Sequence, residues 1–309
     1  MTKCVNCFIP YQDKAQVEQT VRGLKESMLV NSIYLLSTDH SAEPVEGCEI
    51  VHIESLKCTP AIKKIAEKSD SQYTLIYTKE STLMLGLFAL ERMVKISEDA
   101  SAGMVYSDHF QIIEGVKKPS PVITYQMGSL RDDFNFGSVL FYNSKALKEA
   151  ASQMDTKYLF AGLYDLRLKV SQNYEIVHIN EYLYTEVEQD NRKSGEKIFD
   201  YVDPKNRSVQ IEMEAACTEH LKKIGGYLEP NFKQIEFNKG NFEVEASVII
   251  PVFNRIKTIE DAVKSVLKQK TSFKFNLIIV DNHSTDGTYE AIEKYSSDER
   301  LIHILPSRS

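Results

Sequence analysis

Residues 246–255 read Ala-Ser-Val-Ile-Ile-Pro-Val-Phe-Asn-Arg, and two further informative segments follow at 265–269 and 279–288. The first segment is an apolar run that ends at Pro251, which is typical of a buried strand. The second lies in a stretch with apolar residues at helical spacing. The third, Ile-Val-Asp-Asn-His-Ser-Thr-Asp-Gly-Thr, ends a strand at Asp281 and passes into a helix start. Strand, helix and strand in this order predict a mostly parallel α/β sheet flanked by helices.

Polar residues follow each of these strands at the place where a ligand would bind. In an open parallel sheet, ligands lie beyond the carboxyl ends of the strands. Pro251 ends the first strand there, Asn254 follows in the loop, and Asp281 ends the second strand. Asp286 opens the next helix, where backbone N–H groups cluster. A carboxylate at Asp281 can accept hydrogen bonds from a nucleobase imide or a ribose. As turn and cap residues, Asp281 and Asp286 would instead serve only the loop.

The three segments resemble the opening of a family 2 glycosyltransferase of the GT-A fold, the fold of nucleotide-diphospho-sugar transferases, over about 60 residues. The resemblance implies that a nucleotide-diphosphate sugar, foremost a UDP-sugar, is the donor. It implies transfer with inversion to a glycan or polysaccharide acceptor of the cell envelope, with Mg²⁺ or Mn²⁺ in the intact second domain. Peripheral membrane association of the intact protein would fit such an acceptor.

An earlier part of the chain repeats the same order of elements. Phe8–Asp13 echoes Ile249–Asn254, and Leu36–Ser41 echoes Ile279–Ser284. The individual residues agree weakly, but strands and helices alternate in the same order. The sequence therefore predicts a GT-A fold that is repeated, with a partial second copy.

The repeat divides the chain into three parts. Residues 1–230 are expected to form a diverged GT-A domain, 231–244 a linker, and 245–309 the nucleotide-binding start of a second domain. The chain stops at Ser309, before the metal motif and the base that the resemblance would place further on. We therefore expect a truncated second copy without a catalytic half.

The first copy lacks the metal motif of the family. Family members place an acidic D-x-D after the fourth strand, where hard carboxylate oxygens hold a divalent cation on the diphosphate. Here the strand at 73–77 runs into Thr78-Lys79-Glu80-Ser81. Lys79 either neutralises diphosphate charge directly or marks a site that no longer works. By the resemblance, the nucleotide-binding residues of this copy are Pro10, Asp13, Asp39 and Lys79.

Four stretches of the first copy suggest further site residues. The run 128–137 resembles the acceptor side, where Arg131 could bind phosphate and Asp132 or Asp133 could bind sugar hydroxyls or a metal; it also reads as a solvated loop. Asp108, before His109, is a candidate metal ligand. The resemblance makes Asp165 the base that deprotonates the acceptor hydroxyl, with a plain helix N-cap as the alternative. Arg192-Lys193-Ser194-Gly195 resembles a basic loop over the donor.

The composition excludes several other classes. The net charge of −7 disfavours nucleic acid as a partner. The chain has no apolar run of the ~20 residues that span a membrane and no signal-peptide pattern, so a cytoplasmic location is expected. Five scattered cysteines argue against a disulfide framework, and the Cys4-x-x-Cys7 pair is interpreted as small buried side chains.

Two function hypotheses from different classes remain. The first is a tandem glycosyltransferase. The second is a first domain without catalysis that binds a carbohydrate or a partner and positions the second domain. A dehydrogenase would need a G-x-G-x-x-G after a strand, and a nucleotidyltransferase a Gly-rich loop where Pro10 and Pro251 stand.

Overall fold

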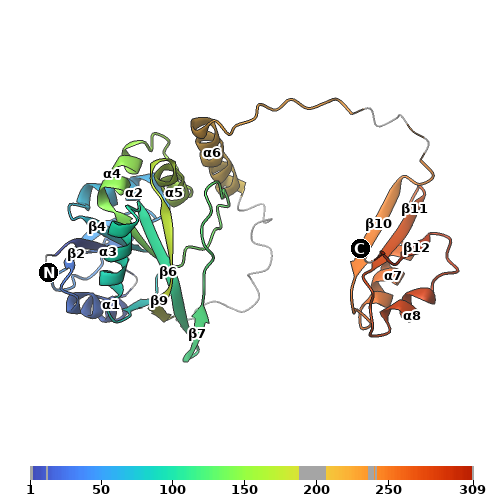
Figure 1. Ribbon diagram of the computed structural model, residues 1–309, viewed down its shortest axis with the longest axis horizontal. Coiled ribbons are helices and arrows are strands. Elements are labelled where there is room, and N and C mark those ends of the chain that lie inside the picture. Colours follow the sequence, from blue (N-terminus) through green and yellow to red (C-terminus); the bar gives the residue numbers. More distant parts are fainter. Residues whose placement is uncertain (1–2, 12, 188–206, 236–239, 241, 308–309) are drawn as a thin grey trace. The chain divides into compact units, whose positions relative to one another are not determined.

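The computed structural model describes residues 3–11, 13–187, 207–235, 240 and 242–307 (Figure 1). The chain divides into two compact parts, Met1–Glu229 and Pro230–Ser309, which we call unit 1 and unit 2. Each unit is described by itself. Within the described residues, no helix is long and apolar enough to cross a membrane.

Unit 1 is built on a nine-stranded sheet with the strand order β3-β2-β1-β4-β8-β6-β9-β5, and β7 pairs with β6. The strands are β1 Val5–Pro10, β2 Val30–Ser37, β3 Glu49–His52, β4 Tyr73–Tyr77, β5 Thr82–Leu85, β6 Met104–Ile113, β7 Val116–Ser120, β8 Val139–Asn143 and β9 Ile176–Val187. The helices are α1 Lys14–Glu26, α2 Thr59–Lys68, α3 Ala89–Asp99, α4 Ser144–Ser152, α5 Gly162–Asn173 and α6 Arg207–Ile224.

The expected α/β class is confirmed, and the sheet of unit 1 is mixed. Strands β3, β2, β1 and β4 are parallel neighbours, as the alternation of strands and helices predicts. Strand β8 then pairs antiparallel with both β4 and β6, and β5 pairs antiparallel with β9. The parallel half is the part that the repeated strand–helix pattern covers.

Helices cover both faces of this sheet because its central strands are apolar on both sides. Cys7 and Ile9 of β1 pack in one core cluster with apolar residues of α1 and α3. Phe8 between them packs in the other cluster, with residues of α2, α4 and α5. This alternation is the two-residue period of a strand. Cys4 and Cys7 are free thiols, and Cys7 is fully buried, as the interpretation of small buried side chains requires.

The helix starts follow the expected capping chemistry in part. Asp13 caps α1, because its side chain accepts a hydrogen bond from the Gln16 N–H at 2.9 Å. Pro60 stands at the start of α2. Asn143 is the N-cap of α4, and its side chain accepts hydrogen bonds from two backbone N–H groups. Thr258 precedes α7 (Ile259–Leu267) without a side-chain cap bond.

Unit 2 is a three-stranded parallel sheet in the order β10-β11-β12. The elements of unit 2 follow along the chain in this order: β10 Ala246–Val252, α7, β11 Phe275–Asp281, α8 Thr288–Glu293 and β12 Leu301–Ile304. Val263 of α7 and Ile292 of α8 pack on Leu277 and Ile279 of β11, so both helices lie on one face of the sheet. The carboxyl ends of β10 and β11 therefore meet at one edge.

Candidate functional site

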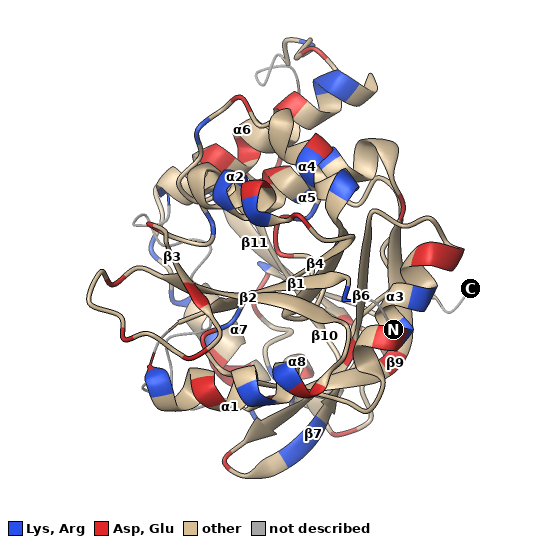
Figure 2. Ribbon diagram, turned by 90° about the vertical axis from the view of Figure 1, so that its left-hand side faces the viewer, with Lys and Arg blue, Asp and Glu red and all other residues tan. Residues whose placement is uncertain are grey.

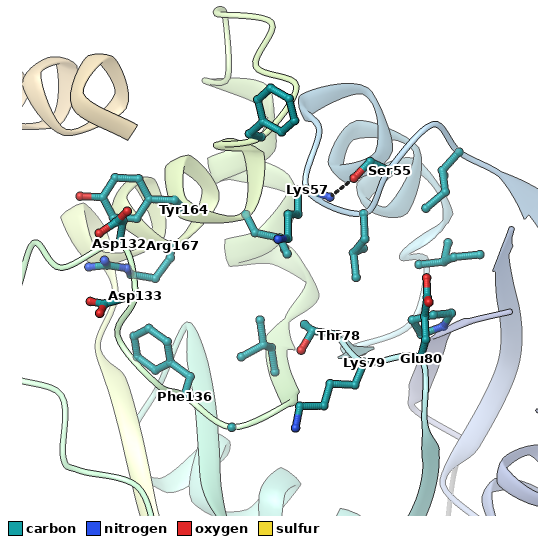
Figure 3. A pocket seen from close by; sticks show the side chains of 18 of the residues that line it. Ser55, Lys57, Thr78, Lys79, Glu80, Asp132, Asp133, Phe136, Tyr164 and Arg167 are labelled. Atoms are coloured by element: carbon teal, nitrogen blue, oxygen red, sulfur yellow. Dashed lines mark hydrogen bonds between the residues drawn. The ribbon is translucent and has the colours of Figure 1, made fainter. Parts of the chain in front are cut away.

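A cavity of about 1110 Å³ opens in unit 1 beyond the carboxyl ends of its parallel strands. Pro10 ends β1, Thr38 follows β2, Lys57 follows β3, and residues 78–81 follow β4. This is the edge at which ligands bind in open α/β sheets. Figure 3 shows Lys57, Lys79 and Glu80 on one side of this cavity.

The opposite side of the cavity comes from the segment before β8 and from α5. Residues 132–137 form one part, and Tyr164 and Arg167 project from α5 beside them (Figure 3). Arg131 and Asp133 form a bidentate ion pair in the same segment, with distances of 2.9 and 2.8 Å. Both side chains are largely exposed, so this pair shapes the rim more than it stabilises the fold. Asp132 and Asp133 line the cavity, as an acceptor-side role requires.

Lys79 lines the cavity and is held by a buried carboxylate that the sequence did not reveal. Its Nζ lies 2.6 Å from Oε2 of Glu186 in β9, whose side chain is fully buried. Gln111 also donates to Glu186 Oε2 at 3.2 Å, and the Ser138 hydroxyl donates to Oε1. Burial opposes the charged form, but the hydrogen bonds from Lys79 and Ser138 hold the pKa of Glu186 below its usual value.

Asp13 and Asp39 were both expected at the nucleotide. In the structure, their carboxylates accept hydrogen bonds from backbone N–H groups two or three residues further along the chain. Asp13 caps α1. Oδ1 of Asp39 accepts from the Ser41 N–H at 2.8 Å, and both of its oxygens contact the Ser41 hydroxyl. These bonds lower the pKa of Asp39. Neither residue lines the cavity, whereas Pro10 and Thr38 do. The structure thus places Asp13 and Asp39 beside the cavity, and a contact of either residue with a nucleotide stays a prediction.

Asp165, the expected base, lies in a buried ion pair. Asp165 lies in the first turn of α5, after the N-cap residue Ala161, and is 1% exposed. Its Oδ1 accepts from Lys169 Nζ at 2.7 Å, and Lys169 also donates to Glu219 of α6 at 2.9 Å. Burial disfavours the charged lysine, but these two carboxylates outweigh it and raise the pKa of Lys169. Asp165 does not line the cavity, so its carboxylate joins α5 to α6.

Asp108, a candidate metal ligand, is occupied by protein donors. Oδ1 of this buried residue accepts from the Val122 N–H at 2.9 Å and lies 2.9 Å from His178 Nε2. His178 Nδ1 in turn lies 3.0 Å from the Thr124 hydroxyl. The chain of contacts ties the segment after β7 to β6 and β9. A metal role for Asp108 is therefore not supported.

Within the described part of the chain, no group of three or more His, Cys, Asp or Glu side chains is placed to hold a metal ion. Glu80 is the acidic residue of Thr78-Lys79-Glu80-Ser81, and Lys79 puts a cation beside it. The Mg²⁺ or Mn²⁺ expected for the intact second domain stays a prediction. Arg192-Lys193-Ser194-Gly195, expected over the donor, lies outside the described residues.

Unit 2 gathers its expected residues around one loop. The Asn254 side chain accepts from the Thr285 N–H at 2.8 Å, and the Asn254 N–H donates to the Ser284 hydroxyl at 2.9 Å. Asp286 accepts from the Ile256 N–H at 3.1 Å and also from Thr288. Asn254 has a φ of +51°, a left-handed conformation that asparagine tolerates. These bonds fix the loops after β10 and β11 against each other, beyond Pro251.

Asp281 is fully buried, whereas the next residue, Asn282, is exposed. Oδ1 of Asp281 accepts from the Ser284 N–H at 2.9 Å, and Oδ2 has no hydrogen-bond partner among the described residues. His303 Nε2 lies 3.9 Å from Oδ2. The side chain that faces solvent at the carboxyl end of β11 is thus Asn282, which the sequence reasoning passed over. Alternation along a strand is the signal that could have found it.

The pairing of the strands shows which positions of the two units are equivalent in their sheets. Pro10 pairs with Leu36 in unit 1, and Pro251 pairs with Val280 in unit 2. Ser37 therefore corresponds to Asp281. Like Asp281, Ser37 is buried and holds the following turn, since its hydroxyl accepts from the Asp39 N–H at 3.0 Å. The two units share this turn design with different side chains.

Comparison with known proteins shows which proteins unit 2 is similar to. Residues 247–308 match the model of the family described as Glycosyl transferase family 2. Over 65 residues the chain is 40% identical to a glycosyltransferase named for teichuronic acid biosynthesis, TuaG of Bacillus subtilis (strain 168), a match that covers 21% of this chain and 25% of TuaG. It is 36% identical over 59 residues to the uncharacterized glycosyltransferase YfnE of the same organism, which covers 19% of this chain and 15% of YfnE.

A solved structure is similar in fold over a larger part of the chain. The structure of S. aureus TarS residues 1–349 in complex with UDP-GlcNAc is similar with a TM-score of 0.50 and 12% identity, covering 72% of this chain and 66% of that one. That share exceeds what Pro230–Ser309 could supply alone, so the likeness reaches into unit 1. The chain has an α/β fold compatible with GT-A. It spans about a quarter of the length of TuaG and less of YfnE.

Proposed function

We propose that the chain is part of a glycosyltransferase that takes a sugar from a nucleotide-diphosphate sugar, foremost a UDP-sugar, and passes it with inversion to a glycan. The observation that carries the proposal is the loop cluster of unit 2. There the residues of the family match place Asn254, Asn282 and Asp286 at the carboxyl ends of two parallel strands. The name of TuaG, which refers to teichuronic acid biosynthesis, supports a polysaccharide as the acceptor class. The complex of TarS with UDP-GlcNAc supports a UDP-sugar as the donor.

In this proposal the nucleoside lies against the loop 282–285. Asn282 presents an exposed amide that can donate to and accept from a nucleobase. Asp281 does not contact the ligand but fixes the loop through the Ser284 N–H. Pro251 and Asn254 form the neighbouring wall. We assign no base within the described residues, because Asp165 is sealed between α5 and α6.

A second candidate function applies to unit 1, as a carbohydrate-binding domain that positions the rest of the protein. Two observations favour it. Thr78-Lys79-Glu80 stands where two acidic residues would hold a metal, and Asp165 is withdrawn from the cavity. The cavity lining combines aromatic side chains with polar ones, as sugar-binding surfaces require: Tyr11, Phe134, Phe136, Phe160 and Tyr164, with the carboxylates Glu54, Glu80, Asp132 and Asp133.

The experiment that tests the proposal is calorimetric titration of residues 1–309 with UDP, UDP-sugars and GDP-sugars, with and without Mn²⁺. We expect UDP to bind and Asn282→Ala to weaken its binding by about tenfold, the cost of one hydrogen bond to a buried ligand. Lys270→Ala, at an exposed position of the same unit, is the control. Absence of UDP binding, or equal binding to Asn282→Ala, would contradict the nucleoside site.

A further inference from the structure

The α5 side of the unit 1 cavity holds a buried arginine whose charge no carboxylate matches. Arg167 is 4% exposed and lines the cavity. Its Nη1 donates to the Ser129 carbonyl at 2.7 Å and its Nη2 to the Arg131 carbonyl at 2.8 Å. Across the described part of unit 1, no Asp or Glu side chain forms an ion pair within 4.0 Å of this guanidinium. A buried charge without a counter-ion is unusual and calls for a partner.

A second polar group of the cavity lining lacks a hydrogen-bond partner among the described residues. Tyr142 of β8 is fully buried and lines the same cavity, and its hydroxyl has no hydrogen-bond partner among the described residues. Burial raises the pKa of Tyr142, and the charge of Arg167 acts in the opposite direction. Both side chains line the same cavity. An unpaired buried hydroxyl is unfavourable, so its retention needs a reason.

Aromatic rings surround the guanidinium. Its Cζ lies 4.9 Å from the ring centroid of Tyr164 and 5.8 Å from those of Tyr125 and Phe136. The rings and the two carbonyls fix the position of Arg167 and keep water away from it. Attraction to an anion is stronger in such surroundings than in water. Asp133, the nearby acidic residue of the rim, is already neutralised by Arg131.

We propose that Arg167 and Tyr142 form a subsite for one oxyanion of a sugar ligand, either the carboxylate of an acidic sugar or the phosphate of a sugar phosphate. A guanidinium has five N–H donors, and the two carbonyl bonds leave three of them for such a group. Arg167 keeps a small exposed area. The Tyr142 hydroxyl is fully buried, so the proposal includes a shift of cavity-wall side chains that opens it to the ligand. The subsite goes beyond the proposed function, because it holds whether unit 1 transfers a sugar or only binds one.

The test is titration of residues 1–309 with glucuronate, glucose 1-phosphate, inorganic phosphate and glucose, followed by calorimetry or ligand-observed NMR. We expect the sugar anions to bind about tenfold or more tightly than glucose, since only they satisfy the two donors. The order of glucuronate and glucose 1-phosphate identifies which oxyanion the subsite prefers. No nucleotide is used, so a failure of the nucleoside site in unit 2 leaves this result unaffected.

Tyr142→Phe is the decisive variant. It removes a hydroxyl that has no hydrogen-bond partner among the described residues, so the fold is retained, and the affinity for the sugar anion falls about fivefold or more. Tyr73→Phe, at a buried tyrosine of β4 outside the cavity lining, is the matched control with unchanged affinity. Arg167→Met abolishes binding. The proposal is overturned if glucose binds as well as the anions, if no anion binds at about 10 mM, or if Tyr142→Phe binds as tightly as the parent.

Discussion

The Lys79 ammonium lies 2.6 Å from Oε2 of Glu186, and only one of the two charges reaches solvent. The Lys79 side chain is 37% exposed and that of Glu186 is fully buried. Losing the lysine therefore leaves a buried carboxylate, whereas losing the carboxylate leaves a lysine that can turn into water. We expect Lys79→Met to lower the free energy of unfolding of unit 1 by about 3 kcal/mol, and Glu186→Gln by less than half of that.

Urea unfolding of the variants measures this difference. Lys95→Met breaks an exposed pair with Asp99 at 2.8 Å and serves as the control, with a loss below about 1 kcal/mol. Equal losses for Lys79→Met and Glu186→Gln would contradict the asymmetry.

His109, next to this pair, makes the stability of unit 1 depend on pH. Its Nε2 lies 3.4 Å from Glu186 Oε1, and its ring stacks on Tyr184 at 5.0 Å. Burial lowers the pKa of His109 below 6.5 and outweighs the opposing effect of Glu186. The unfolded chain therefore takes up the proton first, and stability is lost as the pH falls from about 6.5 toward the folded value. The lowered pKa of Glu186 acts in the same direction, but only below about pH 4.5.

His109→Phe keeps the stacked ring and removes the titrating group. We expect this variant to flatten the decline in the free energy of unfolding between pH 7 and 5, measured by urea titration at each pH. His220, whose pKa burial also lowers, contributes a remaining slope. An unchanged slope in His109→Phe would show that other groups carry the pH dependence.

Substitution of Asp165 tests whether this residue has a structural or a catalytic role. Its contact with Lys169 is buried, and Lys169 is shared with Glu219, so Asp165→Asn weakens the joint between α5 and α6. We expect a loss of about 2 kcal/mol in unfolding free energy, and a change of less than about twofold in sugar affinity, because Asp165 does not line the cavity. A variant with full stability and lost glycosyl transfer would restore the role of base.

The helices and strands with a strong local pattern could be predicted from the sequence alone. The strand ending at Pro10, the strand that passes Pro251 and ends at Val252, and the cap at Asp13 follow from apolar runs and capping chemistry within a few residues. The resemblance to the family also located the match at 247–308. These features depend on neighbours in the chain, so a linear pattern contains them.

The side chains that define the cavity could not be found in this way. Glu186 meets Lys79 across 107 positions, and Arg167 meets the Ser129 carbonyl across 38. Only the folded sheet brings these partners together, and no spacing in the sequence encodes the contact. The ion pair of Asp165 could not be predicted for the same reason, because Glu219, which shares Lys169, belongs to another helix. For Asp281, the motif places a carboxylate at the end of the strand, and only the structure shows that it is buried while Asn282 is exposed.

Substitutions of Asp281 show whether this residue or Asn282 contacts the nucleoside in unit 2. If the Asp281 carboxylate contacts the nucleoside, its charge matters, and Asp281→Asn loses affinity for UDP. The structure argues otherwise, because Oδ1 is used by the Ser284 N–H at 2.9 Å and the whole residue is buried. An asparagine can keep that bond, since its carbonyl oxygen accepts in the same position, and its amide can donate toward His303 Nε2, which has no partner among the described residues. Asp281→Ala loses the bond and leaves the loop unsupported.

We therefore expect Asp281→Asn to bind UDP within about twofold of the parent chain, and Asp281→Ala to bind about tenfold more weakly, the cost of one charge-assisted hydrogen bond that holds the loop. Calorimetry of both variants beside Asn282→Ala measures this, and amide hydrogen exchange of Ser284 reports directly on the loop. Faster exchange in Asp281→Ala alone fits a supporting residue. Equal losses of affinity in Asp281→Asn and Asp281→Ala, with Ser284 still protected in the former, would instead place the carboxylate on the nucleoside.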